Sequence, residues 1–124
     1  MNLKTITDSR GSLTVIEKPP FEIKRVYYLH HIDAGKTRGG HAHRKLRRIM
    51  VAVHGSFVVT VRAGKHIKYR DVTLNDPCVG LQIEPMEWLE LHSFKDDAVC
   101  LVLASEEHDE SDCIRDFAEF KGLL

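Results

Sequence analysis

Short runs of β-branched and aromatic residues, separated by turn residues, recur from about residue 12 to residue 104 of the chain. Runs of this length, bounded by Gly, Pro, Asn and Asp, are typical of antiparallel strands rather than of strands that alternate with helices. We therefore predict an all-β fold, a small antiparallel β-barrel. The expected strands are residues 12–17, 22–31, 47–55, 56–64, 66–74, 79–85 and 98–105, with turns between them that include His54-Gly55 and Lys95-Asp96-Asp97.

The last 19 residues, 106–124, have a different character. They begin with an acidic stretch and then place Ile114, Phe117 and Phe120 at a helical period. Asp109 and Ser111 are both residue types that cap helices. The pattern predicts a short C-terminal helix packed on the outside of the barrel.

Length and charge exclude several classes of protein. A chain of 124 residues with 43% hydrophobic residues suits one domain, residues 1–124, with its own core. Its formal net charge of zero offers no overall field to attract nucleic acid or an anionic membrane. No signal sequence and no apolar run long enough to span a bilayer is recognisable, so we expect a cytoplasmic location.

The three cysteines, Cys78, Cys100 and Cys113, are odd in number and lack C-x-x-C spacing. A disulfide framework would use an even number of cysteines, and a zinc knuckle would use paired ones. We expect reduced thiols, with Cys100 in the core.

Two histidines two residues apart are the main candidates for chemistry. Residues i and i+2 of a strand face the same side, so His41 and His43 share one face while Ala42 points the opposite way. The preceding Gly39 and Gly40 permit a bulge or a close approach of backbone to a ligand. For an isolated H-x-H motif a purely structural role is as good an interpretation as a pocket.

The same parity argument applies to residues 24–28, where Arg25 and Tyr27 fall on the face opposite Val26 and Tyr28. If the Arg25 face is internal, a guanidinium, a phenol and two imidazoles line one pocket, which suits phosphate binding and proton transfer. If that face is external, these are ordinary solvated residues. Parity alone does not choose between the two.

A metal site is the first alternative to weigh, because H-x-H on a small β-barrel opens the cupin metal signature. The carboxylate ligand of that signature follows four residues after the second histidine, where this chain has Arg47. A cation at that position repels a divalent metal, and no histidine stands at the later expected offset. Glu90 and His92 are the nearest substitutes, so we expect no metal.

A basic run, residues 44–48, raises the possibility of nucleic-acid binding. It alternates across an expected strand and lacks aromatic residues on which bases stack. We interpret it as a solvated strand face with at most one phosphate contact.

Taken together, several blocks of the sequence resemble the sugar 3,4-ketoisomerase family of cupins. In the family's order and over nearly the whole chain, the blocks are DSRGSL, PFEIKRVYY, TRGGHAHRKL, the turn at residues 76–81, LVLAS and DESDCIR. The resemblance implies a cupin jelly roll that converts a dTDP-4-keto-6-deoxyhexose to its 3-keto isomer, for amino sugars of surface polysaccharides. It also implies no metal or other cofactor, and a homodimer that exchanges N-terminal strands.

Roles for individual residues follow from the same resemblance. His41 is expected to be the general base and His43 to orient or relay protons, since an imidazole with a pKa of about 6.5 suits proton transfer at neutral pH. Tyr27 and Arg38 are expected to hydrogen-bond the developing oxyanion. The remaining candidates bind substrate; they are Arg25, Arg10, Lys45 and Trp88.

Three other functions stay open from the sequence. A sugar-nucleotide 3- or 5-epimerase also removes a proton next to a ketone, and would need a donor such as a tyrosine across the ring from His41. A non-catalytic cupin that binds a nucleotide sugar is suggested by Gly40 and Leu89, where the family usually has an aromatic and a basic residue. A metal-dependent enzyme is the most remote. The product's configuration at C4 is left open, although Arg10 resembles the galacto-type form.

Overall fold

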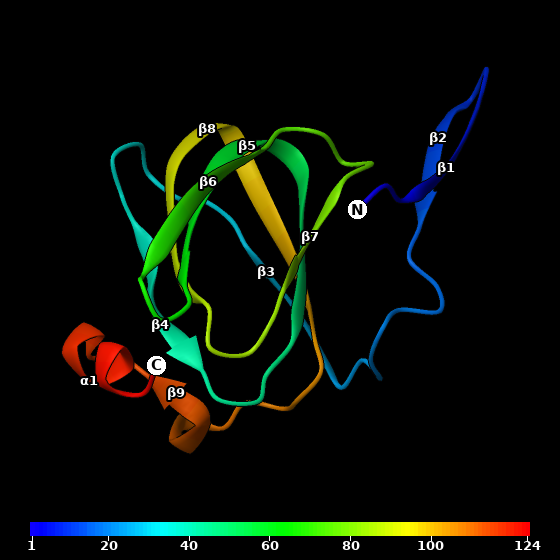
Figure 1. Ribbon diagram of the computed structural model, residues 1–124. Helices are drawn as coiled ribbons and strands as arrows, with labels where there is room; N and C mark the ends of the chain where they lie inside the picture. The colour runs from blue at the N-terminus through cyan, green and yellow to red at the C-terminus, as the bar shows by residue number, and fades with distance from the viewer.

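The computed structural model describes residues 1–124 as an antiparallel β structure of strongly curved strands (Figure 1). Its two longest strands, β5 and β8, pair with each other along nearly their whole length, from Arg48↔Ala104 to Arg62↔Trp88. The elements, in chain order, are β1 Lys4–Asp8, β2 Gly11–Val15, β3 Arg25–Leu29, β4 Arg38–His43, β5 Arg48–Ala63, β6 Lys68–Leu74, β7 Gly80–Ile83, β8 Trp88–Ala104, a 3₁₀ turn Glu110–Asp112, β9 Cys113–Ile114 and α1 Phe117–Gly122.

The β5–β8 ribbon belongs to both walls of the molecule. The first half of β5 pairs with β7 and the second half with β6, while β8 pairs with β4 near its start and with β3 near its end. One wall therefore has the order β7-β5-β8-β3 and the other β6-β5-β8-β4-β9. This arrangement agrees with the predicted all-β cupin jelly roll.

Two predicted turns are instead bends within continuous strands. The expected strands 47–55 and 56–64 are a single strand, β5, and residues 95–97 lie inside β8. The pairing register shifts near these positions, and Gly55, Asp96 and Asp97 all have positive φ. Bulges bend a strand without ending its pairing, which is why turn-forming residues gave a false turn signal here.

Alternation along β5 separates two apolar layers. Met50 and Ala52 join the main core of fourteen buried residues, which also contains Phe57 and Cys100. Their neighbours Ile49 and Val51 face the other side, where residues of the N-terminal segment cover them: Leu3, Ile16, Phe21 and Ile23. The prediction that Cys100 is buried is confirmed, and all three cysteines are free thiols.

A second, smaller core holds the C-terminal segment against the barrel. Trp88, Phe120, Ile114 and Ala42 are all almost fully buried there, and Phe117 packs against them. The predicted helix is present but shorter than expected, because Ile114 lies in β9 and pairs with Ala42. Its N-cap is Asp116, whose carboxylate accepts from the backbone N–H of Ala118 at 2.8 Å. Neither helical segment is long and apolar enough to cross a membrane.

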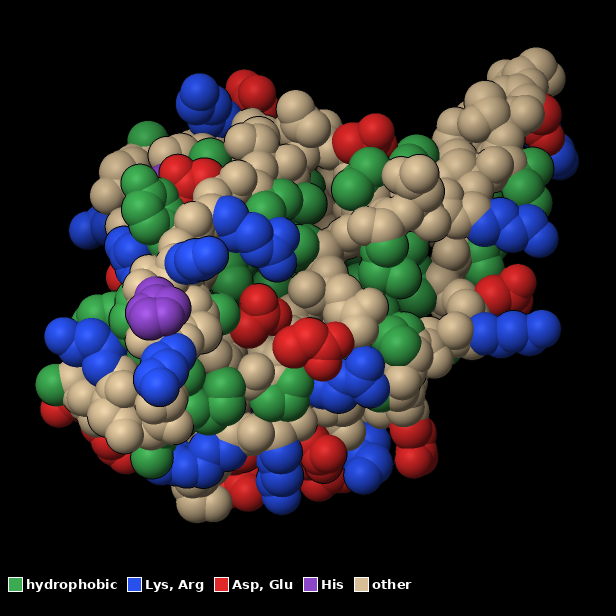
Figure 2. All heavy atoms as spheres, viewed as in Figure 1, with side chains coloured by type: hydrophobic (Ala, Val, Ile, Leu, Met, Phe, Trp, Pro, Cys, Tyr) green, Lys and Arg blue, Asp and Glu red, His purple; other side chains and the backbone are tan.

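The N-terminal hairpin, formed by β1 and β2, projects from the body (Figures 1 and 2). β1 was not among the predicted strands. One face of the hairpin carries Ile6 and Leu13, which are cross-strand partners and more than half exposed. Basic and acidic side chains are interspersed over the face seen in Figure 2, as expected for a chain without net charge.

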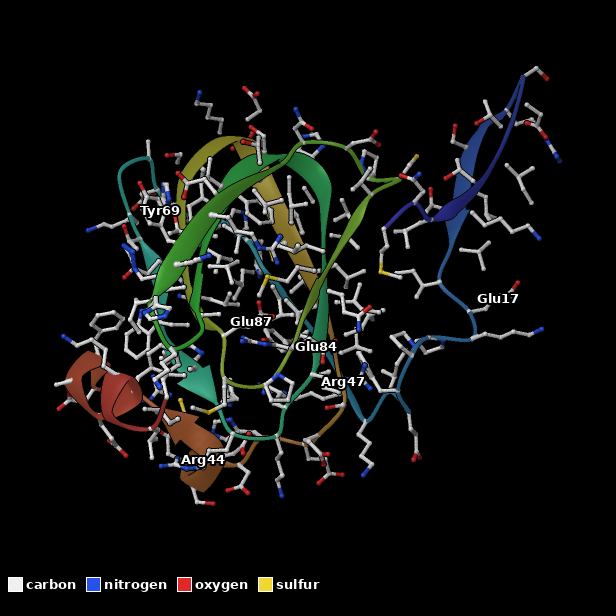
Figure 3. The ribbon with its side chains drawn as sticks, in the orientation of Figure 1. Glu17, Arg44, Arg47, Tyr69, Glu84 and Glu87 are labelled. Carbon is white, nitrogen blue, oxygen red and sulfur yellow. The ribbon has the colours of Figure 1, made fainter.

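The small C-terminal core predicts a clear difference between two aromatic substitutions. Phe120 is completely buried, so Phe120→Ala should lower the free energy of unfolding by about 3–5 kcal/mol through lost burial and a residual cavity. Tyr69 on β6 is 68% exposed (Figure 3), so Tyr69→Ala should change it by only about 0.5 kcal/mol. Urea unfolding of both variants measures the difference, and equal losses would contradict this account of the core.

Candidate active site

The two histidines of β4 face the same cavity, as their parity predicted. Ala42 points the other way, into the C-terminal core, while His41 and His43 both line a cavity of about 450 Å³. Their ring centroids are 5.1 Å apart and the rings are nearly perpendicular. The two imidazoles therefore form one unit in contact with any ligand that enters.

A bulge at the start of β4 sets the direction of His41. The register of β4 against β8 shifts between Gly39 and His41, and Gly39 and Gly40 have φ values of 89° and 78°. A Cβ on Gly39 would lie 2.8 Å from the carbonyl oxygen of Leu89. Only glycine permits this approach with this backbone, which confirms the predicted bulge.

Parity left open which face of β3 is internal. In the structure it is the face that carries Arg25. Arg25 and Tyr27 line the cavity with the histidines, whereas Val26 and Tyr28 are more than half exposed. The Arg25 guanidinium lies over the Tyr27 ring, 4.5 Å from its centroid. The four polar groups expected to share one pocket therefore do so.

The outer part of the cavity is rich in cations. Arg25 and Arg38 both line it, and neither forms an ion pair with a carboxylate of the chain. Arg115 also lines it but is bound to Glu110 through a 2.6 Å contact. Unpaired guanidinium groups at the edge of a cavity are suited to a phosphate or pyrophosphate.

Arg48 is the functional candidate that the sequence analysis missed. It is only 4% exposed, its Nε has no hydrogen-bond partner, and it lines the inner end of the site beside His41. No carboxylate pairs with it, although a buried charge is costly unless it is paired. The available signal was period-two alternation, since Arg48 shares the inward face of β5 with Met50 and Ala52.

Beside His41 lies an inner chamber of about 100 Å³, which shares Tyr27, Arg38, Gly39 and His41 with the larger cavity. Arg48, Arg38, His41 and Tyr27 stand at its polar side. The rest of its wall is apolar and consists of Leu29, Met50, Leu89, Leu91 and Val102. The site thus has a cationic outer part and a mainly apolar inner end that contains one buried cation.

The C-terminal segment brings a carboxylate to the second histidine. Asp112 is buried, with 7% exposed, and its Oδ2 lies 3.4 Å from Nδ1 of His43. β9 pairs with β4, placing Cys113 opposite His43. The sequence showed DESDCIR as a block but gave no indication that it meets the histidine strand.

Both histidines have lowered pKa values. Burial is the main cause for each, because it disfavours the charged imidazolium, and the positive charge of Arg48 adds to it. The pKa of His43 falls to about 4, in spite of Asp112, which acts in the opposite direction. Both imidazoles are therefore neutral at pH 7 and able to accept a proton.

A metal would find only a partial set of ligands in this site. Donor atoms of His41, His43 and Cys113 lie within 4.8 Å of one another. No carboxylate completes the set, burial raises the pKa of the Cys113 thiol, and the cation of Arg48 lies nearby. The residues therefore do not fit a divalent metal. The cation that would repel the metal is Arg48, whereas the sequence predicted Arg47. Arg47 points away and binds Glu84 and the carbonyl of Pro20 (Figure 3).

Three predicted substrate-binding residues lie outside this cavity. Trp88 is 4% exposed in the C-terminal core, where it packs on Phe117 and Phe120, so a contact with substrate stays a prediction. Lys45 lines a neighbouring small hollow beside His43. Arg10 lies in the turn between β1 and β2, where it binds Asp8. Within one chain it is not among the residues that line the histidine cavity.

The fold and the site define the class of protein: a cupin with two neutral histidines, a buried arginine and further arginines in the outer part of the cavity. Comparisons of the chain with known proteins agree with this class. The FdtA model, described as WxcM-like, C-terminal, matches residues 1–124. A TDP-4-oxo-6-deoxy-alpha-D-glucose-3,4-oxoisomerase of Aneurinibacillus thermoaerophilus is 45% identical, over 100% of this chain and 90% of the relative. The chain belongs to this WxcM-like family of FdtA proteins.

Solved structures support the same assignment. One is the 3,4-ketoisomerase QdtA of Thermoanaerobacterium thermosaccharolyticum, which is 38% identical with a TM-score of 0.94. That structure is of a mutant with asparagine in place of a histidine, in complex with TDP-4-keto-6-deoxyglucose. The match covers 98% of this chain and 89% of QdtA. WlaRA of Campylobacter jejuni, a TDP-fucose-3,4-ketoisomerase, is 32% identical with a TM-score of 0.92, covering 99% and 92%.

The electrostatics of the site predict the effect of removing Arg48. Because its cation disfavours imidazolium, Arg48→Met should raise the pKa of both His41 and His43, moving His43 upward from about 4. Methionine should also be tolerated, since replacing a buried charge by an apolar side chain is often neutral for stability. NMR titration of the imidazoles measures the shift. Arg47→Met is the control, and an unchanged or lower pKa in Arg48→Met would contradict this assignment.

Proposed function

We propose that residues 1–124 act as one domain, a sugar-nucleotide 3,4-ketoisomerase that moves the keto group of a dTDP-4-keto-6-deoxyhexose from C4 to C3. One observation carries the proposal. The buried, unpaired guanidinium of Arg48 lies next to two imidazoles that burial keeps neutral. Such a site stabilises an anion that forms when a base removes a proton, which is the chemistry of an enediolate.

The reaction needs one base and one site for negative charge. The base takes the proton from C3, and the electron pair moves through the C3–C4 bond to the carbonyl oxygen, giving an enediolate. The hydroxyl proton of the C3 oxygen then passes to the C4 oxygen, and the base returns its proton to C4, which leaves a ketone at C3 and a hydroxyl at C4. One base that reaches both carbons from one face of the ring suffices, and Arg48 with Tyr27 and Arg38 would stabilise the oxygen that becomes charged.

The surroundings of the two histidines favour His43 as the base. The carboxylate of Asp112 approaches His43 and not His41, and a carboxylate orients a basic imidazole and stabilises its protonated form. This choice reverses the roles that the family resemblance suggested. His41, 5.1 Å away and beside the inner chamber, is then the neighbour that hydrogen-bonds substrate oxygen or relays the proton.

The shape of the cavity supports an orientation for the substrate. The nucleotide is attached at C1, so Arg25, which lines the larger cavity but not the inner chamber, would hold the pyrophosphate. The opposite end of the ring, with C3, C4 and the C6 methyl group, then enters first. An inner chamber with one polar side, which includes Arg48 and His41, and one apolar side suits a ketone oxygen and a methyl group together.

The test of the proposed function is incubation of the protein with dTDP-4-keto-6-deoxyglucose in deuterated buffer, followed by proton NMR of the sugar. We expect a 3-keto product with deuterium at C4, whose coupling constants give the C4 configuration. Exchange at C3 or C5 without migration of the carbonyl would identify an epimerase instead. Binding of the nucleotide sugar without any exchange would identify a non-catalytic binding protein.

Asparagine substitutions distinguish the two histidines. Because asparagine keeps polarity but cannot accept the proton, His43→Asn should lower kcat by about 10²–10⁴-fold and change KM much less. His41→Asn should cost less than His43→Asn and should retain measurable exchange at C3. Steady-state kinetics and the exchange assay check both. A dead His41→Asn beside a nearly normal His43→Asn would reverse the assignment.

We also propose that the protein is a homodimer in which the N-terminal hairpins are exchanged. The hairpin exposes Ile6 and Leu13, and the outer face of β3 exposes Val26 and Tyr28, each 55–62% exposed. Exposed apolar side chains on two separate elements suit a two-fold interface in which each copy covers the other. Arg10 at the hairpin tip would then approach the partner subunit, consistent with a role in substrate binding that it lacks within one chain.

The dimer proposal predicts that a charge on the apolar face of the hairpin separates the subunits. Leu13→Asp should halve the mass measured by light scattering, because the carboxylate would be buried without a partner. Thr7→Asp places the same charge on the other face of the hairpin, next to Ser12, and should leave the dimer intact. A monomeric wild-type protein, or a Leu13→Asp protein that stays dimeric, would refute it.

A further inference from the structure

Asp112 joins the C-terminal segment to the loop that follows the histidine strand. Its Oδ1 accepts from the N–H of Lys45 at 3.0 Å and its Oδ2 from the N–H of Leu46 at 3.2 Å. Its own carbonyl accepts from the N–H of Arg44 at 3.0 Å. Three consecutive backbone N–H groups after β4 are therefore bound by one buried residue.

The same carboxylate is the nearest acceptor to a buried ring nitrogen. Nδ1 of His43 is enclosed by protein, and Oδ2 of Asp112 lies 3.4 Å from it. That separation is longer than a strong hydrogen bond, but no other group of the chain bonds Nδ1. His43 also lines the cavity, so Nε2 is the nitrogen left to meet a substrate.

We propose that Asp112 is a positioning residue that holds the neutral His43 in its Nδ1–H form, leaving the Nε2 lone pair to act on the substrate. This inference deepens the proposed function and depends on it for the catalytic part. The physical reason is that a carboxylate is acceptor-only when ionised, so the nitrogen facing it must carry the hydrogen. The opposite tautomer would place two lone pairs against each other in a buried site.

The carboxylate can serve both purposes because its two oxygens have room for about four hydrogen bonds. Two are used by backbone N–H groups, which hold the carboxylate in place, and Oδ2 also faces Nδ1 of His43 at 3.4 Å, where there is room for a further hydrogen bond. When His43 takes the proton from the substrate, the new positive charge lies beside this anion. The pair thus resembles the carboxylate–histidine arrangement that orients a general base.

Other charged and titratable groups also face His43, and they set the background for any measurement on it. Cations disfavour its protonated form, whereas carboxylates favour it. The groups that line the same hollows or act on its charge are Arg25, Tyr27, Arg38, His41, Lys45, Arg48, Glu106, Glu107, His108, Asp109, Glu110, Cys113 and Arg115. Of the carboxylates, only Asp112 forms an ion-pair contact with it.

Nitrogen-15 NMR of the imidazole rings at pH 7 tests the proposal without substrate, because the two ring nitrogens shift differently when protonated. In the wild-type protein we expect His43 as the Nδ1–H form. In Asp112→Asn the amide offers both a donor and an acceptor, so this preference should weaken or reverse. Asp109→Asn is the matched control, since Asp109 bonds Ser111 in the same turn and does not touch His43.

Kinetics then separate positioning from a general loss of folding. Asp112→Asn should lower kcat by about ten- to hundredfold while KM and the affinity for dTDP, measured by calorimetry, change less than about twofold. Asp109→Asn should match the wild type. The pH dependence of kcat should also change. The carboxylate of Asp112 raises the pKa of His43, so its removal lowers that pKa, and the activity of Asp112→Asn should persist to a lower pH than that of the wild type.

Several results would overturn the inference. It fails if His43 is found as the Nε2–H form in the wild type, if the tautomer is the same in Asp112→Asn, or if Asp109→Asn loses as much activity. If the wild-type protein shows the expected tautomer but no isomerase activity, the positioning by Asp112 stands and the proposed function fails. The tautomer measurement on the wild type needs no variant, so poor folding of Asp112→Asn does not affect it.

Discussion

The antiparallel pairing of β5 with β8 is the constraint on which the other features depend. It runs from Arg48↔Ala104 to Arg62↔Trp88 and bends at bulges, so the same two strands enter both walls. Because side chains alternate along a strand, this pairing turns Arg48 and Leu89 toward the cavity and Trp88 toward the C-terminal core. An error of one residue in this register would turn each of these side chains to the other face.

The C-terminal segment contributes to the site through packing on the opposite side of one strand. Ala42 lies between His41 and His43 and is buried with Ile114 and Phe120. This apolar contact holds β9 against β4, and the pairing places Asp112 near His43. The aromatic core therefore helps to orient polar groups that it never touches, which explains why a short terminal helix belongs to a catalytic domain.

The charges of the site are consistent with a substrate that brings negative charge to two places. Arg25 and Arg38 stand at the outer part without carboxylate partners, and Arg48 is buried at the inner end. The neutral histidines lie between them, with pKa values lowered by burial and by Arg48. A nucleotide sugar supplies a permanent anion outside, and its enediolate supplies a transient one inside. The same cations disfavour a divalent metal at the histidine pair.

The sequence alone determined the all-β class, the shared face of His41 and His43, and the bulge before them, because alternation and glycine chemistry are local properties of a chain. It also carried the family resemblance. Two bends were wrongly predicted as turns, because the turn residues near positions 55 and 96 are equally typical of a bulge. Only the tertiary structure decided that the Arg25 face is internal, that Arg48 is a buried cation, and that Asp112 meets His43. These depend on pairings between strands far apart in the chain, such as Arg25 with Ala104, Arg48 with Ala104 and Ala42 with Ile114, and no local pattern records them.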